Sequence, residues 1–179
     1  MTYPNVRRAA SDDQDRLGEL WLDLLNEQAE HDDRLVIADD ARERWNNDFP
    51  VWLEDETCRI YVAETETGIV GFTSVHRWGP PPIYEASSEL YLDELYVAPS
   101  ARREGYGTQL VHAVVDWADR LQARRIRLST LSANEAAQAF WTSQDAVPMT
   151  TTFTLERSPE GSPGDGSSEI EGSKKIGFQ

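Results

Sequence analysis

The segment LYVAPSARREGYGTQLV, residues 95–111, constrains the fold more than any other part of this 179-residue chain. An apolar run ends at Pro99, two arginines and two closely spaced glycines follow, and apolar residues then recur at helical spacing. The pattern predicts a strand that leads through a tight turn into a helix. The first turn of a helix carries unpaired backbone N–H groups and a positive partial charge, so this turn is suited to hold an anion.

The residue types in the turn favour a phosphate group as that anion. Gly105 and Gly107 lack the Cβ atoms that would keep a phosphate from the backbone amides, and Arg102 and Arg103 add guanidinium donors. The turn is not a P-loop, because no lysine lies near it, and a dinucleotide fingerprint would need a third glycine where Leu110 stands. These features make the turn a candidate pyrophosphate-binding site. Taken alone, residues 102–107 could also be an arginine-rich turn that binds no ligand.

The first half of the chain predicts helices and strands that belong to one α/β domain over residues 1–155, because the chain is too short for two well-filled cores. We expect a strand at residues 5–9, a helix that begins with a Ser11–Gln14 capping box, a second helix at about 38–53 broken at Pro50, and two hairpin strands between residues 59 and 78 joined by a turn that ends at Gly68.

The second half continues the alternation of strands and helices. We expect a proline-rich loop at 79–88, strands at 89–97 and 124–130, helices after the glycines and at 134–143, and one or two closing strands at 146–155. The helix after the glycines is expected to bury Leu110, Val111, Val114, Val115, Ala118 and Leu121. Ser, Gly, Pro and acidic residues dominate residues 156–179, so this tail is expected to be disordered.

Two stretches together resemble the GNAT superfamily of N-acetyltransferases. The acetyl-CoA-binding pattern of that family, L-x-V-x-P-x-x-R-x-x-G-x-G, is matched by Leu95, Val97, Pro99, Arg102, Gly105 and Gly107. NEAAQAFW is similar to the family's N-x-x-A-x-x-F-Y segment, with matches at Asn134, Ala137 and Phe140. The resemblance covers residues 5–155 and implies an α/β fold with a mixed, mostly antiparallel sheet of six or seven strands and helices on both faces.

The resemblance also implies where acetyl-CoA, the co-substrate, would bind. The strand that ends at the motif would separate from its neighbour, and the pantetheine arm would lie in the gap against Leu95, Tyr96 and Val97. The pyrophosphate would contact the turn formed by Arg102, Arg103, Glu104, Gly105, Tyr106, Gly107 and Thr108. Asn134 and Phe140 would lie beside the pantetheine arm. Asn134 is also a candidate helix N-cap, with Ser132 as the rival.

Catalysis of acetyl transfer needs a base that makes the acceptor amine neutral. Asp93 and Glu94 are candidates, because neighbouring strand residues point to opposite faces and one of them would face the acceptor. His76, on the preceding strand, is a third candidate, ahead of His31 and His112. A backbone N–H of Tyr96 or Val97 would polarise the thioester carbonyl.

The chain departs from the family pattern at two positions. Trp141 stands where many members carry the tyrosine thought to protonate the thiolate, and an indole N–H has no practical acidity. Water or another hydroxyl would then supply the proton, with Tyr84, Tyr91, Tyr96 and Ser143 as candidates. Asp145 replaces the family's usual glycine, which leaves the shape of the last hairpin open.

The preferred function is an acetyl-CoA-dependent N-acetyltransferase that moves an acetyl group to a primary amine, of a small cationic molecule or of a protein, by direct attack on the thioester. A non-catalytic CoA-binding sensor or interaction module is the alternative, and Trp141 favours it. The net charge is −15, and the first 57 residues hold 16 Asp and Glu against 6 Arg, which favours a cationic acceptor. It disfavours nucleic acid and anionic membranes as partners. Because only two lysines are present, the acidity could equally reflect a salt-adapted source.

Compartment and assembly are constrained less firmly. The sequence contains no apolar run long enough for a membrane span and no signal peptide, so a cytoplasmic monomer or homodimer is expected. Cys58 is the only cysteine, which excludes an intrachain disulfide and a cysteine-rich zinc site, and no metal is expected.

Overall fold

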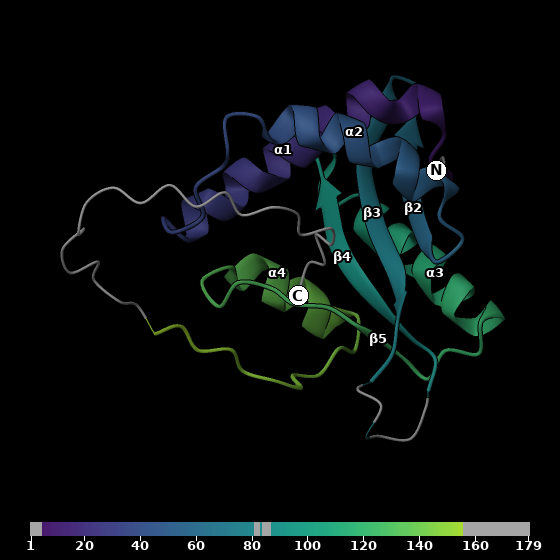
Figure 1. Ribbon diagram of the computed structural model, residues 1–179, viewed down its shortest axis with the longest axis vertical. Coiled ribbons are helices and arrows are strands. Elements are labelled where there is room, and N and C mark those ends of the chain that lie inside the picture. The colour runs from purple at the N-terminus through teal and green to yellow at the C-terminus, as the bar shows by residue number, and fades with distance from the viewer. Residues whose placement is uncertain (1–4, 81–82, 84–86, 156–179) are drawn as a thin grey trace, which may run out of the picture.

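The computed structural model describes residues 5–80, 83 and 87–155, and its centre is one mixed β-sheet (Figure 1). The strands follow one another across the sheet in chain order: β1 (Asn5–Arg8), β2 (Cys58–Thr65), β3 (Gly68–Trp78), β4 (Glu89–Val97) and β5 (Arg125–Arg127). The first three pairings are antiparallel, and β5 runs parallel to β4. The expected disordered tail, residues 156–179, and most of the proline-rich loop lie outside the described residues.

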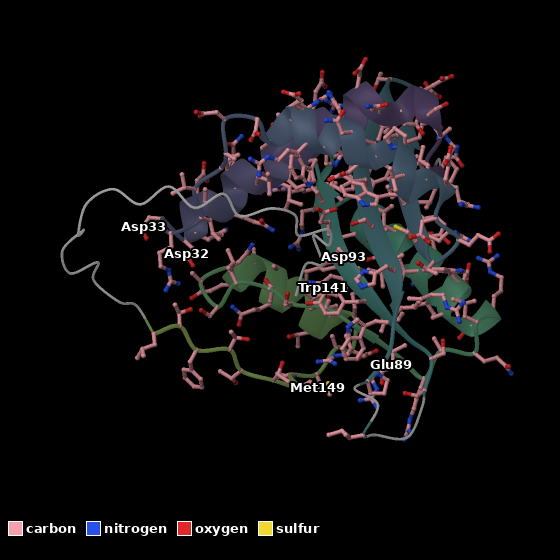
Figure 2. The ribbon with its side chains drawn as sticks, viewed as in Figure 1. Asp32, Asp33, Glu89, Asp93, Trp141 and Met149 are labelled. Atoms are coloured by element: carbon pink, nitrogen blue, oxygen red, sulfur yellow. The ribbon has the colours of Figure 1, made fainter. Side chains whose placement is uncertain are left out.

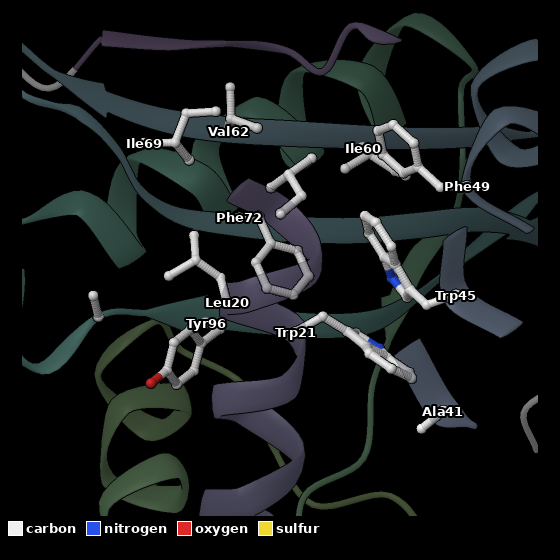
Figure 3. Close-up of a cluster of buried hydrophobic side chains, with 12 residues drawn as sticks. Leu20, Trp21, Ala41, Trp45, Phe49, Ile60, Val62, Ile69, Phe72 and Tyr96 are labelled. Carbon is white, nitrogen blue, oxygen red and sulfur yellow. The ribbon is translucent and has the colours of Figure 1, made fainter. Parts of the chain in front are cut away.

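Helices cover both faces of the sheet, as expected. Helices α1 (Gln14–His31) and α2 (Ala41–Glu54) pack on one face, where the core includes Leu20, Trp45, Phe49, Val62 and Phe72 (Figure 3). Helix α3 (Tyr106–Arg120) packs on the other face, against a second core that includes Val75, Leu90, Leu92, Leu110 and Val114. Helix α4 (Glu135–Ser143) follows β5 in the chain and is seen to the left of β4 in Figure 1.

The buried face of α3 differs from the expected one at two positions, because Val111 is only half-buried and lies outside the second core, and Val115 is exposed. Val115 was expected in the core, but its side chain is 38% exposed, and Trp117 is 6% exposed instead. Trp117 lies one turn after the fully buried Val114, and the guanidinium of Arg59 covers its ring at 5.1 Å. The apolar stripe is therefore narrower than expected, and a tryptophan fills the space at its end.

The Ser11–Gln14 capping box expected at the start of α1 is wrong: the N-cap of α1 is Asp13, whose side chain makes no capping hydrogen bond to this helix. Ser11 lies in a short 3-10 turn that precedes the helix. The carboxylate of Asp13 accepts a hydrogen bond from the N–H of Ala10 at 2.8 Å, and Arg7 donates to the same carboxylate at 2.7 Å. The Asp13 carboxylate thus holds the 3-10 turn that leads into α1, through the N–H of Ala10 and the guanidinium of Arg7.

Helix α2 runs through Pro50, where a break was expected. Proline has no N–H, so the carbonyl of Asn46 loses its partner within the helix. The side-chain amide of Gln14, in α1, donates to this carbonyl at 3.0 Å. The neighbouring helix thus supplies the hydrogen bond that Pro50 cannot make.

The sheet has five strands among the described residues, and the prediction of six or seven was wrong. Residues 146–155 form no strand, and the side chains of Val147, Phe153 and Leu155 are each more than 80% exposed. Alternating apolar residues favour a strand only where a partner edge is available. The neighbouring strand, β5, offers an edge of only three residues.

Candidate cofactor and acetyl-transfer site

Strands β4 and β5 separate after the first third of β4. Their pairing consists of Glu89 with Arg125, Leu90 with Ile126 and Tyr91 with Arg127, whereas β4 continues to Val97. Residues 92–97 therefore have no strand partner on this edge among the residues that the structure describes. We call residues 92–97 of β4 the open edge.

Two side-chain contacts hold the strands together just before they separate. The carboxylate of Glu89, which is 3% exposed, pairs with the guanidinium of Arg125 at 2.9 Å. The hydroxyl of Tyr91 donates to the hydroxyl of Ser129 at 3.0 Å. Figure 2 shows Glu89 toward the start of β4 and Asp93 further along it. The gap thus begins at a fixed point.

Backbone groups alternate between the two sides of β4. The N–H of Ala98 donates to the carbonyl of Val70 at 2.8 Å, on the β3 side. Because consecutive residues of an antiparallel strand direct their N–H and C=O groups to opposite sides, those of Tyr96 also face β3. Those of Leu95 and Val97 face the open edge. Of the two N–H groups proposed to polarise the thioester, only that of Val97 is directed to the gap.

The glycine turn has the backbone geometry of a left-handed cap. Gly105 precedes α3 with a φ of 91°, and a Cβ built there would meet no atom within 4 Å. Arg103 also has a positive φ, 68°, and its side chain is exposed. The amides at the start of α3 are therefore approachable from solvent at the position of Gly105.

Helix α4 brings two candidate residues to this region. A Cβ on Gly107 would lie 3.3 Å from the ring of Phe140, so Phe140 packs directly against the glycine turn. Asn134 caps α4 by accepting a hydrogen bond from the N–H of Ala137 at 2.9 Å, which confirms the N-cap prediction over Ser132. Asp145, which replaces the family's usual glycine, has a φ of 60°, a left-handed conformation that glycine and, less often, aspartate adopt.

Arg102 is bound within the protein by a residue that the sequence did not reveal. Its guanidinium donates to both carboxylate oxygens of Glu27, at 2.7 and 2.8 Å, and its Nε donates to the carbonyl of Val97 at 2.8 Å. The hydroxyl of Tyr96 donates to Glu27 at 2.9 Å. Glu27 lies on α1, 75 residues before Arg102, and no local pattern connects the two.

Asp93 and Glu94 lie on the same face of the sheet, so the expected opposite orientation is wrong. The pairing of β3 with β4 shifts register between Ser74 and Val75, which leaves Asp93 as an extra residue in β4. A bulge of this kind interrupts the alternation of side chains. Glu94 bonds Ser74 and Asp93 bonds His76, two residues apart on β3 and hence on one face.

Both oxygens of Glu94 are held by donors. Trp21 of α1 donates its indole N–H to one oxygen at 2.8 Å, and the Ser74 hydroxyl donates to the other at 2.6 Å. Burial raises the pKa of Glu94, although these two hydrogen bonds oppose the shift. Glu94 is thus fixed between α1 and β3.

His76 and Asp93 form a histidine–carboxylate pair that solvent can reach. Nδ1 of His76 lies 2.7 Å from Oδ2 of Asp93, and the two side chains are 31% and 17% exposed. The hydrogen bond to Asp93 raises the pKa of His76 above its ordinary value, although burial opposes this. The pair is close to the start of the open edge, because Tyr91, the register partner of His76, is the last residue paired with β5.

The remaining proton-donor candidates are mostly committed elsewhere. The Ser143 hydroxyl donates to the carbonyl of Phe140 at 2.6 Å, and burial and Glu27 raise the pKa of Tyr96. Trp141 is partly buried in the second core, with its ring 5.0 Å from that of Phe140. Tyr84 lies outside the described residues.

Within residues 5–80, 83 and 87–155, no group of three His, Cys, Asp or Glu side chains could hold a metal ion. No helix in the same ranges is long and apolar enough to cross a membrane.

Residues 17–145 match the model of the acetyltransferase (GNAT) family, so the chain belongs to the GNAT acetyltransferase family. It is 34% identical over 85 residues to the probable N-acetyltransferase camello of Xenopus laevis. This match covers 48% of the chain and only 36% of the length of that relative.

Solved structures share the fold at lower identity. The tetramutant of the BH1408 protein from Bacillus halodurans superposes with a TM-score of 0.77 at 19% identity, over 86% of this chain and 99% of that one. The aminoglycoside N-acetyltransferase AAC(6')-Iy, solved in complex with CoA, superposes with a TM-score of 0.70 at 17% identity, over 88% of this chain and 96% of that one.

Proposed function

We propose that this protein transfers the acetyl group of acetyl-CoA to a primary amine, of a small cationic molecule or of a protein, by direct attack of the amine on the thioester. The observation that carries the proposal is the open edge of β4, which leads directly into the left-handed turn at Gly105. Family membership supports the reaction class, and the CoA complex of AAC(6')-Iy supports CoA as the cofactor.

The pantetheine arm would lie along the open edge as an added strand. The backbone groups of Leu95 face the gap and are suited to bond its amides, whereas the carbonyl of Val97 already accepts a hydrogen bond from Arg102. The pyrophosphate would lie on the amides of residues 103–108, with the exposed Arg103 as a side-chain partner. Asn134 and Phe140 would flank the arm from α4, which is supported by the contact of Phe140 with Gly107.

His76 is the proposed base, and Asp93 orients it. With Nδ1 held by Asp93, Nε2 can take the proton of the ammonium group. The neutral amine forms the new C–N bond as the C–S bond breaks, and the Val97 N–H stabilises the charge on the carbonyl oxygen. The proton that the attacking nitrogen loses as it becomes an amide passes through water to the thiolate. Glu94 suits this role less well, because each of its oxygens already accepts a hydrogen bond.

The acidic first part of the chain supports a cationic acceptor, since α1 and α2 carry half of its carboxylates and the segments around them carry the rest. The acceptors to test are therefore polyamines, aminoglycosides and lysine-containing peptides.

The proposal is tested by incubating the protein with acetyl-CoA and each amine while the release of the CoA thiol is followed. We expect release that saturates in both substrates, and a Gly105→Val variant that needs about ten times more acetyl-CoA to reach saturation. Burial raises the pKa of Cys58 to about 11, so this thiol should contribute little background. Tight acetyl-CoA binding without turnover on any amine would instead favour the non-catalytic module. The absence of binding would contradict the cofactor site.

A further inference from the structure

The cofactor turn is tied to α1 through one carboxylate. Glu27, near the C-terminal end of α1, accepts hydrogen bonds from Arg102 at 2.7 Å and from the hydroxyl of Tyr96 at 2.9 Å. The guanidinium of Arg102 also lies over the ring of Tyr96, 5.4 Å from its centroid. The end of β4 and the residue before the turn are thus both bound to one side chain of α1, which lies 69 and 75 residues earlier in the sequence.

Arg102 extends this connection to the open edge. Its Nε donates to the carbonyl of Val97 at 2.8 Å, and this carbonyl faces the gap between β4 and β5. Val97 is the last residue of β4, and Arg102 immediately precedes the turn at residues 103–108. The guanidinium therefore connects the end of the strand to α1 at the point where the chain enters the turn.

We infer that Glu27 is a positioning residue for the cofactor site: it holds Arg102 and Tyr96 so that the end of β4 and the glycine turn keep one geometry relative to α1. This inference rests on the proposed function. Arg102, matched to the family's phosphate-binding segment, then acts through Val97 and Glu27. The phosphate contact falls to Arg103 and the backbone amides.

The exposure of the ion pair makes this role separable from simple stabilisation. The side chains of Arg102 and Glu27 are 42% and 35% exposed, and pairs of this kind contribute little to the free energy of unfolding. Removing the carboxylate should therefore leave the melting temperature nearly unchanged and loosen the turn locally. A residue that served stability alone would show the reverse.

A direct contact between Arg102 and the phosphate would predict the opposite change in acetyl-CoA affinity when Glu27 is replaced. If Arg102 bound the pyrophosphate directly, Glu27 would compete for it, and removal of the carboxylate would strengthen acetyl-CoA binding. If Glu27 positions the turn, its removal weakens binding. The direction of one affinity change distinguishes the two.

The test compares wild-type protein with Glu27→Gln, Arg102→Gln and the double variant, using calorimetric titration of acetyl-CoA. We expect each single variant to weaken affinity about five- to tenfold, and the double variant to lose no more than either single one, because both break the same connection. Glu30→Gln is the matched control. It removes one charge from the same helix at an exposed residue and should bind as the wild type does.

Amide hydrogen exchange, measured without acetyl-CoA, gives an independent readout. Peptides covering residues 95–108 should exchange faster in Glu27→Gln than in wild type or in Glu30→Gln, while peptides from β2 should not change. Tighter acetyl-CoA binding by Glu27→Gln, or unaltered exchange at 95–108, would overturn the inference. If the wild type bound no acetyl-CoA, the proposed function would fail, and the exchange comparison would still decide whether Glu27 positions the turn.

Discussion

The two sides of β4 are built in contrasting ways. Toward β3, β4 is paired along its whole length, from Glu89 opposite Trp78 to Val97 opposite Gly71, with one bulge. Toward β5 the pairing covers three residues and stops at Tyr91. One strand therefore has a complete ladder on one side and an open edge on the other.

The difference separates two tasks that acetyl transfer requires. The complete ladder fixes side chains, and its bulge places Asp93 and Glu94 on one face beside His76 and Ser74. The open edge leaves backbone groups of Leu95 and Val97 without a strand partner, in the part of the chain that the structure describes. The β3 side thus suits proton transfer, and the β5 side suits a bound chain.

The largest effect should come from removing the base on the β3 side. His76→Gln should lower kcat about 100-fold or more, since a general base contributes roughly two to four orders of magnitude. Acetyl-CoA affinity should stay unchanged, because His76 does not belong to the open edge. Steady-state kinetics and calorimetry measure the two quantities. His112→Gln, on the exposed surface of α3, is the control. An unaltered kcat in His76→Gln would remove His76 from the mechanism.

The cofactor turn is tested by a pair of glycines that share one backbone constraint. Gly105 and Gly68 have φ values of 91° and 125°, and a Cβ at either would meet nothing within 4 Å. A valine at either position should cost about 1–3 kcal/mol of strain and lower the melting temperature similarly. Only Gly105→Val should also weaken acetyl-CoA binding, about tenfold. Equal affinities of the two variants would show that the turn does not bind the cofactor.

The point where β4 and β5 separate can be weakened directly. Glu89→Gln removes the partner of Arg125 and should lower the free energy of unfolding by about 1–2 kcal/mol, less than for a fully buried pair because Arg125 is 41% exposed. Thermal unfolding should show this as a fall in Tm of about 2–6 °C. Glu19→Gln breaks an exposed pair with Arg16 and should have almost no effect. Equal effects of the two variants would mean that Glu89 does not anchor β5.

The pH dependence should report the His76–Asp93 pair. The base must be neutral, so kcat should rise with pH through the pKa of His76, which Asp93 raises. Asp93→Asn should move this rise to lower pH, by up to about one unit. Folding stability should change with pH in the opposite direction to kcat. The charged His76–Asp93 pair stabilises the fold below the ordinary pKa of histidine, and this contribution is lost as the pH rises through the raised pKa of His76. A pH–rate profile that does not move in Asp93→Asn would contradict the pairing.

Local patterns predicted much of this molecule. The strand at residues 89–97, the hairpin before it, the helix after Gly105 and the Asn134 cap were all expected, because each rests on periodicity or on turn chemistry within a few residues. The acetyl-CoA motif lies in the same stretch, and family membership confirms the resemblance.

The missed features depend on partners that are distant in sequence. The bulge at Asp93 exists only in the pairing with β3, and the helix through Pro50 depends on Gln14 of another helix. The contact of Glu27 with Arg102 spans 75 residues. The prediction of closing strands at residues 146–155 was wrong for the same reason. The apolar alternation of these residues does not reveal that β5 offers an edge of only three residues.

The most direct test of the open edge is amide hydrogen exchange of single residues in β4, followed by NMR with and without acetyl-CoA. We predict that the amides of Leu95 and Val97, which face the gap, become protected when acetyl-CoA binds, while the Tyr96 amide, already facing β3, keeps its exchange rate. ATP at the same concentration should protect none of them. Saturating acetyl-CoA that leaves Leu95 and Val97 unprotected would contradict the account.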